Sequence, residues 1–151
     1  MDHLFSPLPL RSLTLRNRLM VSPMCTYSCR DGLATDWHLV HLGSRAVGGA
    51  ALVCFEATAV EARGRISAAD LGLWSDAQVE PLARIARFVA EQGAVPAVQL
   101  AHAGRKASTA EPWRGGAPVP ASQGGWEPVA PSALPFAPGH PTPRALEEAS
   151  A

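Results

Sequence analysis

The sequence predicts an α/β protein built from parallel strand–helix–strand units. Three short apolar runs, at residues 19–21, 50–55 and 95–100, have the length of buried strands. Two amphipathic segments with helix-starting signals, 35–47 and 75–92, separate these runs. Strands that alternate with helices in this way form right-handed parallel βαβ units. We therefore expect about three βα units in this chain.

Composition limits the classes of function. The chain has 151 residues, 47% of them hydrophobic, which is enough to form the core of one domain. Its 13 basic and 13 acidic residues give no field of one sign, so we expect neither nucleic acid nor an anionic membrane surface as a partner. No apolar run approaches the roughly 18 residues of a membrane span, and no leader pattern opens the chain. We expect a cytoplasmic protein.

The three cysteines, Cys25, Cys29 and Cys54, form an odd set. They lack the paired Cys-x-x-Cys or Cys/His spacing of a zinc site, so we expect no bound metal. Reduced thiols also fit a cytoplasmic protein better than disulfides do.

The amino-terminal residues predict a hairpin followed by a strand. Residues 4–16 alternate apolar and polar positions after a proline-containing start, which favours a small hairpin that covers another part of the fold. Residues 19–21 then read as a short buried strand, which Pro23 ends because proline cannot donate to a sheet. Just beyond it, Cys25 and Tyr27 place a thiol and a phenol two residues apart, where they could lie over a ligand.

The first helix and the second strand follow. Thr35 is a suitable cap, and Gly48 with Gly49 ends the helix. Part of the predicted apolar face comes from Trp37, Val40, Ala46 and Val47. The continuous apolar run at 50–55 predicts a strand buried on both faces, closed by Glu56, Ala57 and Thr58.

The second helix has the clearest signals. Ser75 and Gln78 have the spacing of a capping box, and Gly93 ends the helix. Its predicted apolar face consists of Val79, Leu82, Ala83, Ala86, Val89 and Ala90. The third strand, 95–100, carries Pro96 near its start, where a missing donor is tolerated.

The last part of the chain changes composition. Residues 107–143 hold nine of the 14 prolines and predict a long loop or lid without regular structure. Residues 143–149, with proline in the first turn, predict the start of a helix.

Two architectures share the βαβ pattern. A doubly wound nucleotide-binding sheet usually has Gly-x-Gly-x-x-Gly after its first strand, and this chain has Ser-Pro-Met-Cys there. A TIM barrel needs no such motif and gathers its site residues at the carboxyl ends of its strands. Candidate site residues do stand at the three strand ends, namely Cys25, Ala57 and Gln99.

Four motifs together resemble the old yellow enzyme family. They are Ser22-Pro23-Met24-Cys25-x-Tyr27, Asp36-Trp37-His38, Glu56-Ala57-Thr58-Ala59-Val60 and Gln99-Leu100-Ala101-His102-Ala103-Gly104-Arg105-Lys106-Ala107. The cysteine at position 25 is similar to that of the branch called thermophilic-like. This resemblance implies the amino-terminal portion of a TIM (β/α)8 barrel: the hairpin, about three βα units and the long proline-rich loop.

The resemblance also implies a function. Members of the family bind FMN, take hydride from NADPH or NADH, and reduce the activated C=C bond of α,β-unsaturated carbonyl or nitro compounds. By match of motif, the cofactor-binding residues would be Ser22, Pro23, Met24, Cys25, Ala57 and Gln99. The glutamine amide offers both donor and acceptor to the flavin pyrimidine edge. Cys25 would tune the flavin, and Tyr27 would polarise the substrate carbonyl.

A complete barrel takes about 250 residues, and only three of its eight strands are present here. The family's substrate-gripping His pair and FMN phosphate ligands fall outside the chain. We expect residues 1–151 to be part of a single barrel domain whose remaining strands a second polypeptide supplies, in an enzyme that is a homo-oligomer when complete. The alternatives are a truncated product and a noncatalytic flavin-binding or assembly module.

Overall fold

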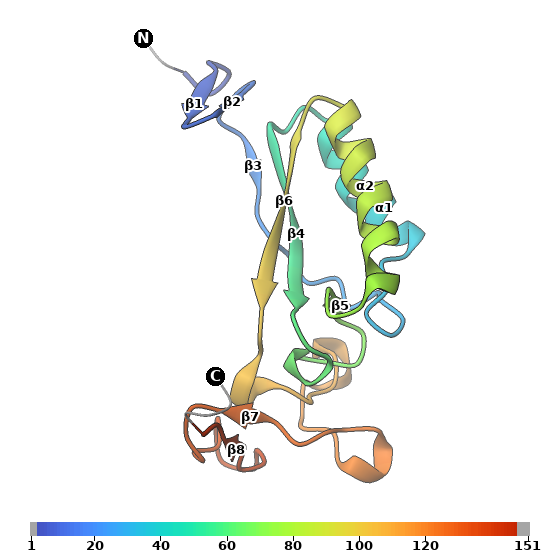
Figure 1. Ribbon diagram of the computed structural model, residues 1–151, viewed down its shortest axis with the longest axis vertical. Helices are drawn as coiled ribbons and strands as arrows, with labels where there is room; N and C mark the ends of the chain where they lie inside the picture. Colours follow the sequence, from blue (N-terminus) through green and yellow to red (C-terminus); the bar gives the residue numbers. More distant parts are fainter. Residues whose placement is uncertain (1–2, 148–151) are drawn as a thin grey trace.

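The computed structural model describes residues 3–147. Two helices pack on one side of a parallel sheet, and a proline-rich region extends from its lower end (Figure 1). The strands are β1 (Leu8–Leu10), β2 (Leu13–Leu15), β3 (Met20–Val21), β4 (Leu52–Ala59), β5 (Leu71–Gly72), β6 (Val95–Ala101), β7 (Val129–Ala130) and β8 (Arg144–Ala145), and the helices are α1 (Asp36–Val47) and α2 (Val79–Glu91). Short 3-10 turns lie at Ala62–Gly64, Asp76–Gln78, Gly104–Lys106, Pro112–Arg114 and Ala121–Gln123.

Strands β3, β4 and β6 lie side by side in chain order. Strand β4 is central, with β3 paired parallel to its start and β6 paired parallel along its length. Strand β5, which the sequence did not predict, pairs with the end of β4 through Thr58 and Leu71. The predicted strands, their parallel direction and the amino-terminal β1–β2 hairpin are therefore confirmed. Neighbouring strands in chain order are the arrangement that a barrel requires.

Both helices begin where the sequence predicts. The backbone N–H of Thr35 donates to Nδ1 of His38 at 3.0 Å. In the same way, the backbone N–H of Ser75 donates to Oε1 of Gln78 at 3.0 Å, and α2 follows one 3-10 turn later. These contacts satisfy backbone donors that have no partner within a helix's first turn.

The core lies between the helices and β4. The side chains of α1 that enter it differ from those that the sequence predicted. The main side chains of the core are Leu42, Ala46, Val53, Phe55, Leu71, Ile85 and Val89. Trp37, Val40 and Val47 are exposed instead. The buried stripe of α1 is His38, Leu42 and Ala46, which repeat at i, i+4 and so lie on one face.

The strand predicted to be buried at residues 19–21 is an exposed edge. Met20 is 58% exposed, and β3 pairs only with β4 in the part of the chain that the structure describes. Strand β6 is also an edge, with Leu100 61% exposed. A strand is buried on both faces only where neighbours and helices cover it, and here that holds for β4.

The region 107–143 is mainly irregular, as predicted, but its end differs. Arg144 and Ala145 form β8, which pairs parallel with β7, whereas the sequence predicted a helix starting at 143. Backbone hydrogen bonds from Arg144 to Pro128 and from Leu146 to Ala130, both 2.9 Å, hold this pairing and replace the helical turn. The last two residues of the predicted helix segment lie outside the described residues. Within residues 3–147 no helix has the length and apolar character needed to cross a membrane.

Candidate functional site

A β-bulge at Glu56 determines which side chains of β4 reach the site. Phe55 pairs with Val98 and Ala57 with Gln99, so Glu56 is an extra residue in β4. In a regular strand, residues two apart face the same side. Here Phe55 packs in the helix-facing core, whereas Ala57 lines a cavity together with Gln99. The bulge therefore places Phe55 and Ala57 on opposite sides of β4.

The cavity has a volume of about 480 Å³ and lies at the carboxyl ends of β4 and β6. Small side chains on β4, Ala57 and Ala59, form part of its wall. Gly64 must stay small as well, because a β-carbon there would lie 2.8 Å from the His102 ring. Polar groups reach the cavity from Asp70, Gln99, His102 and Lys106.

Cys25 lies beside this strand end. Its side chain is half-buried, and its sulfur lies near the backbone of Ala57. Burial raises the pKa of the thiol, while the Ala57 contact opposes that rise. The thiol is therefore protonated at neutral pH. The predicted roles of Cys25 and Ala57 toward a ligand stay predictions.

Tyr27 takes an unusual backbone conformation. Its φ of 49° lies in the left-handed region, which is disfavoured for residues other than glycine. The edge of its ring meets Trp113, with 5.6 Å between the ring centroids. Burial above all, and then the neighbouring Cys25, Asp70 and Glu56, raises the pKa of the phenol, so Tyr27 is a hydrogen-bond donor at neutral pH.

The other residues predicted to bind the cofactor do not all lie at the cavity. Gln99 lines the cavity and is exposed. Ser22 and Met24 are exposed on the stretch between β3 and Cys25, and Pro23 is partly buried. None of these three lines the cavity. Their contact with a cofactor stays a prediction.

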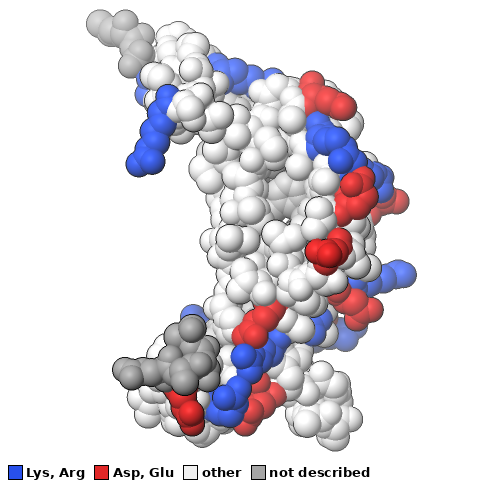
Figure 2. Space-filling view, in the orientation of Figure 1, with Lys and Arg blue, Asp and Glu red and all other residues white. Residues whose placement is uncertain are grey.

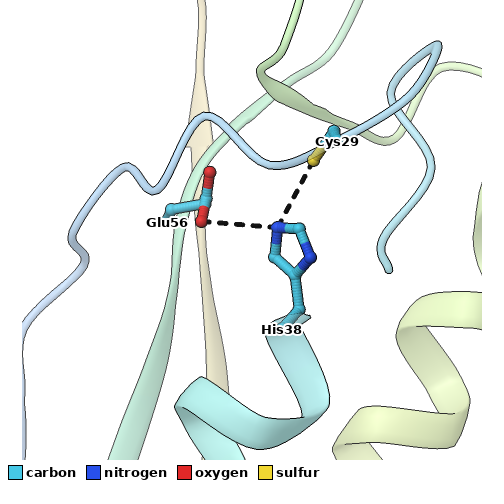
Figure 3. Close-up of side chains that lie close together, drawn as sticks. All are labelled: Cys29, His38 and Glu56. Carbon is cyan, nitrogen blue, oxygen red and sulfur yellow. Dashed lines mark hydrogen bonds and ion pairs between the residues drawn. The ribbon is translucent and has the colours of Figure 1, made fainter. Parts of the chain in front are cut away.

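Sequence reasoning missed a buried polar cluster beneath the segment that carries Cys25. It consists of Cys29, His38 and Glu56 (Figure 3). Nε2 of His38 lies 3.5 Å from Oε2 of Glu56 and 3.4 Å from Sγ of Cys29. Glu56 is 4% exposed and His38 is 1% exposed. The sequence did contain one signal for this cluster. Glu56 directly follows a strand predicted to be buried on both faces, and a buried carboxylate needs a polar partner.

The tautomer of His38 favours polar contacts between these three side chains over a bound metal ion. The three candidate ligand atoms lie within 4.8 Å of one another, as in a metal site. However, Nδ1 accepts the backbone N–H of Thr35 at 3.0 Å, so Nε2 carries the ring proton. To bind a metal ion, Nε2 would need a free lone pair in place of this proton. Nε2–H instead donates toward Glu56 and Cys29.

The loops beyond β4 and β6 are fixed to each other. Nε2 of His102 lies 2.7 Å from Oε1 of Glu61, which also accepts from Nε of Arg63 at 2.8 Å. The hydrogen bond from Arg63, above all, lowers the pKa of Glu61. Nε1 of Trp126 donates to the carbonyl of Arg63 at 2.9 Å and attaches the proline-rich region here. Trp126 thus pins the predicted lid, whereas Trp113 contacts Tyr27.

Known proteins resemble this chain in sequence. Residues 3–132 match the profile of the NADH:flavin oxidoreductase / NADH oxidase family. An NADH:flavin oxidoreductase of Gibberella zeae is 48% identical over 146 residues, covering 94% of this chain and 35% of that protein. An NADPH dehydrogenase of a Geobacillus species is 45% identical, covering 97% of this chain and 39% of that protein. The chain thus spans little more than a third of these relatives.

Solved structures resemble it in fold. Morphinone reductase superposes with a TM-score of 0.78 at 32% identity, covering 99% of this chain and 41% of that one. The old yellow enzyme homologue of Zymomonas mobilis superposes with a TM-score of 0.75 at 29% identity, covering 97% of this chain and 40% of that one.

Proposed function

The chain belongs to the NADH:flavin oxidoreductase / NADH oxidase family, which includes the old yellow enzymes, and we propose that it forms the FMN-binding amino-terminal part of an NAD(P)H-dependent ene-reductase. Its fold is the corresponding part of a TIM barrel. FMN and NAD(P)H are the cofactors of this family. The observation that carries the proposal is the shared cavity of Ala57 and Gln99, with the Cys25 sulfur near the backbone of Ala57.

The residues present fit a flavin. A flat ring system needs strand ends without bulky side chains, and Ala57, Ala59 and Gly64 leave that room. The Gln99 amide offers a donor and an acceptor to a pyrimidine edge that carries both. When bound, FMN supplies hydride transfer between NAD(P)H and a second substrate.

Two side chains would act on the chemistry. The protonated thiol of Cys25 is a weak donor that would adjust the electronic properties of the ring. The phenol of Tyr27 would donate to the carbonyl or nitro oxygen of an alkene substrate and so polarise its C=C bond. Both groups are protonated at neutral pH because burial raises both pKa values. Their assignments rest on the motif match and on this protonation state.

We also propose that a second polypeptide completes the barrel. Figure 2 shows a surface over the sheet that is nearly free of charged side chains, and the edge strand β6 exposes Val98 and Leu100 there. An apolar groove of about 360 Å³ between α2 and β6, lined by Leu82 and Ala86 among others, would receive the next strand–helix unit. Residues 107–143 would then serve as a lid of the same domain, with Trp113 against Tyr27.

The same open sheet favours a second candidate function. An uncovered parallel edge suits pairing with another chain, so this chain could act as a noncatalytic flavin-binding or assembly module. An enzyme would bind FMN and let NAD(P)H reduce it, whereas an assembly module would not.

Native mass spectrometry followed by anaerobic titration with NADPH and NADH tests the proposal. We expect a mass that contains this chain, a second polypeptide and FMN, in a homo-oligomer, with flavin absorbance bleached by the nicotinamide. Gln99→Ala should lower flavin affinity about tenfold, the effect of one or two lost hydrogen bonds. Gln123→Ala, in the 3-10 turn Ala121–Gln123 away from the cavity, is the matched control. A chain that retains no flavin, alone or with partners, would contradict the proposal.

A further inference from the structure

We propose that Glu56 is a positioning residue whose buried carboxylate holds residues 22–28, and with them Cys25 and Tyr27, against the end of β4. The positioning itself follows from the geometry of this chain. Its consequence for catalysis rests on the function proposed above.

The segment 22–28 has little else to hold it. Apart from the ladder of the sheet, no backbone–backbone hydrogen bond joins these residues to the remainder of residues 3–147. The next such bond is that of Cys29, whose N–H donates to the carbonyl of Ala69 at 3.0 Å. Thr26, which lies between Cys25 and Tyr27, instead donates twice to one oxygen of Glu56. Its hydroxyl lies 2.8 Å and its backbone nitrogen 3.2 Å from Oε2.

The bulge and α1 place that carboxylate. Because Glu56 is the extra residue of β4, its side chain reaches the helix side of the sheet, where His38 of α1 meets it. Thr35 fixes the tautomer of His38 through Nδ1, as described above. The Thr35 hydroxyl also donates to the carbonyl of Ser28 at 3.2 Å, and the Ser28 hydroxyl donates to the carbonyl of Thr26 at 2.9 Å. These hydrogen bonds, together with the contact between His38 and Glu56, therefore link β4, α1 and the segment.

Two further observations fit this role. The left-handed backbone of Tyr27 persists only where surrounding contacts determine it, and Thr26 next to it supplies those contacts. The charge of Glu56 is also among the smaller causes, after burial, that raise the pKa values of the Cys25 thiol and the Tyr27 phenol. Glu56 thus favours the protonated form of both groups as well as their position.

The test measures alkylation of Cys25 by iodoacetamide in the full chain, followed by peptide mass spectrometry. The buried Cys29 and Cys54 serve as internal controls for global opening. Thr26→Val removes the hydroxyl donor at nearly constant shape, and Thr26→Ser keeps it. We expect Thr26→Val to accelerate labelling of Cys25 about fivefold, as one lost hydrogen bond predicts. Thr26→Ser should stay within about twofold of the parent chain.

Glu56 variants extend the test. Glu56→Gln keeps an oxygen acceptor for Thr26, so hydrogen–deuterium exchange of the Thr26 amide should rise less than in Glu56→Ala. If Glu56→Ala does not fold, the Thr26 pair still decides the matter. Equal labelling of Thr26→Val and the parent chain would overturn the inference, and so would equal acceleration by valine and serine.

Flavin content measured on the same samples separates the two proposals. Accelerated Cys25 labelling in Thr26→Val, in a chain that binds no flavin, would support the positioning role and contradict the proposed function. Retained flavin with unchanged labelling would do the reverse. In a protein that does reduce alkenes, Thr26→Val should lower kcat for that step and leave flavin reduction by NAD(P)H unchanged.

Discussion

Strands β4 and β6 both end at the cavity, yet neighbouring elements cover β4 and leave β6 exposed. Val53 of β4 is fully buried, with strands on both sides and helices over one face. Leu100 of β6 is 61% exposed at an open edge. The part of the site built on β4 is therefore covered by neighbouring elements within the described residues. The part built on β6, with Gln99 and His102, depends on further neighbours to cover it.

The most direct test of this difference is a leucine-to-alanine substitution at each strand. Leu71→Ala, at a residue with no exposed surface beside the end of β4, should lower the free energy of unfolding by about 2–5 kcal/mol. Leu100→Ala should change it by less than about 0.5 kcal/mol in this chain alone. Denaturation by urea, followed by circular dichroism, measures both values.

The β6 value also reports on the proposed partner. If a second polypeptide covers β6, Leu100→Ala should become costly in the assembled protein and stay nearly neutral in the isolated chain. Equal costs for both substitutions in the isolated chain would mean that β6 is already buried, and the contrast between the two strands would be wrong.

A substitution of Tyr27 tests whether the part of the site beside β4 acts on the substrate. Tyr27→Phe removes the phenol donor and keeps the ring that meets Trp113. Reduction of an activated alkene should slow about a hundredfold, the lower range for loss of a positioned proton donor. Reduction of the flavin by NAD(P)H should change little. Rapid-mixing kinetics resolve the two half-reactions, and an unchanged alkene half-reaction would remove Tyr27 from the chemistry.

The buried cluster on the β4 side should also make stability depend on pH. Burial above all raises the pKa of the Cys29 thiol well beyond its usual range. The folded chain then keeps a proton that the unfolded chain releases above about pH 8.5. Stability from this group is therefore complete below that pH and falls above it, by at most about 1.4 kcal/mol per pH unit. Cys29→Ala should flatten this decline in unfolding measured from pH 7 to 10.

Cys54→Ala is the matched control for this measurement. Burial raises the pKa of the Cys54 thiol too, and we expect its removal to flatten a smaller part of the decline. An unchanged slope in Cys29→Ala would show that the thiol is not held in the protonated form.

Local signals account for what the sequence predicted correctly. Apolar runs located β4 and β6, and the capping pattern at Ser75 and Gln78 located α2. The rule that barrel sites gather at strand ends selected Ala57 and Gln99, which do share a cavity. These features depend on residues close together in the chain, where spacing alone carries the information.

The features that the sequence did not predict depend on distant partners. The exposure of β3 and β6 reflects which strands lie beside them, and no run of apolar residues records that. The strand Arg144–Ala145 forms by pairing with Val129–Ala130 across a loop, against a local helix signal. The cluster around Glu56 needs a bulge in β4 and a particular tautomer of His38, both fixed only after the elements pack.

The bulge adds a side chain to β4 without changing which later residues face the cavity. Without Glu56, Phe55 and Ala57 would be consecutive residues on opposite faces, so Ala57 would still pair with Gln99 beside the cavity. The extra residue therefore supplies a carboxylate on the helix side of the strand. Anyone who transplants this strand into another barrel can keep the cavity wall without the extra residue, but loses the group that binds Thr26.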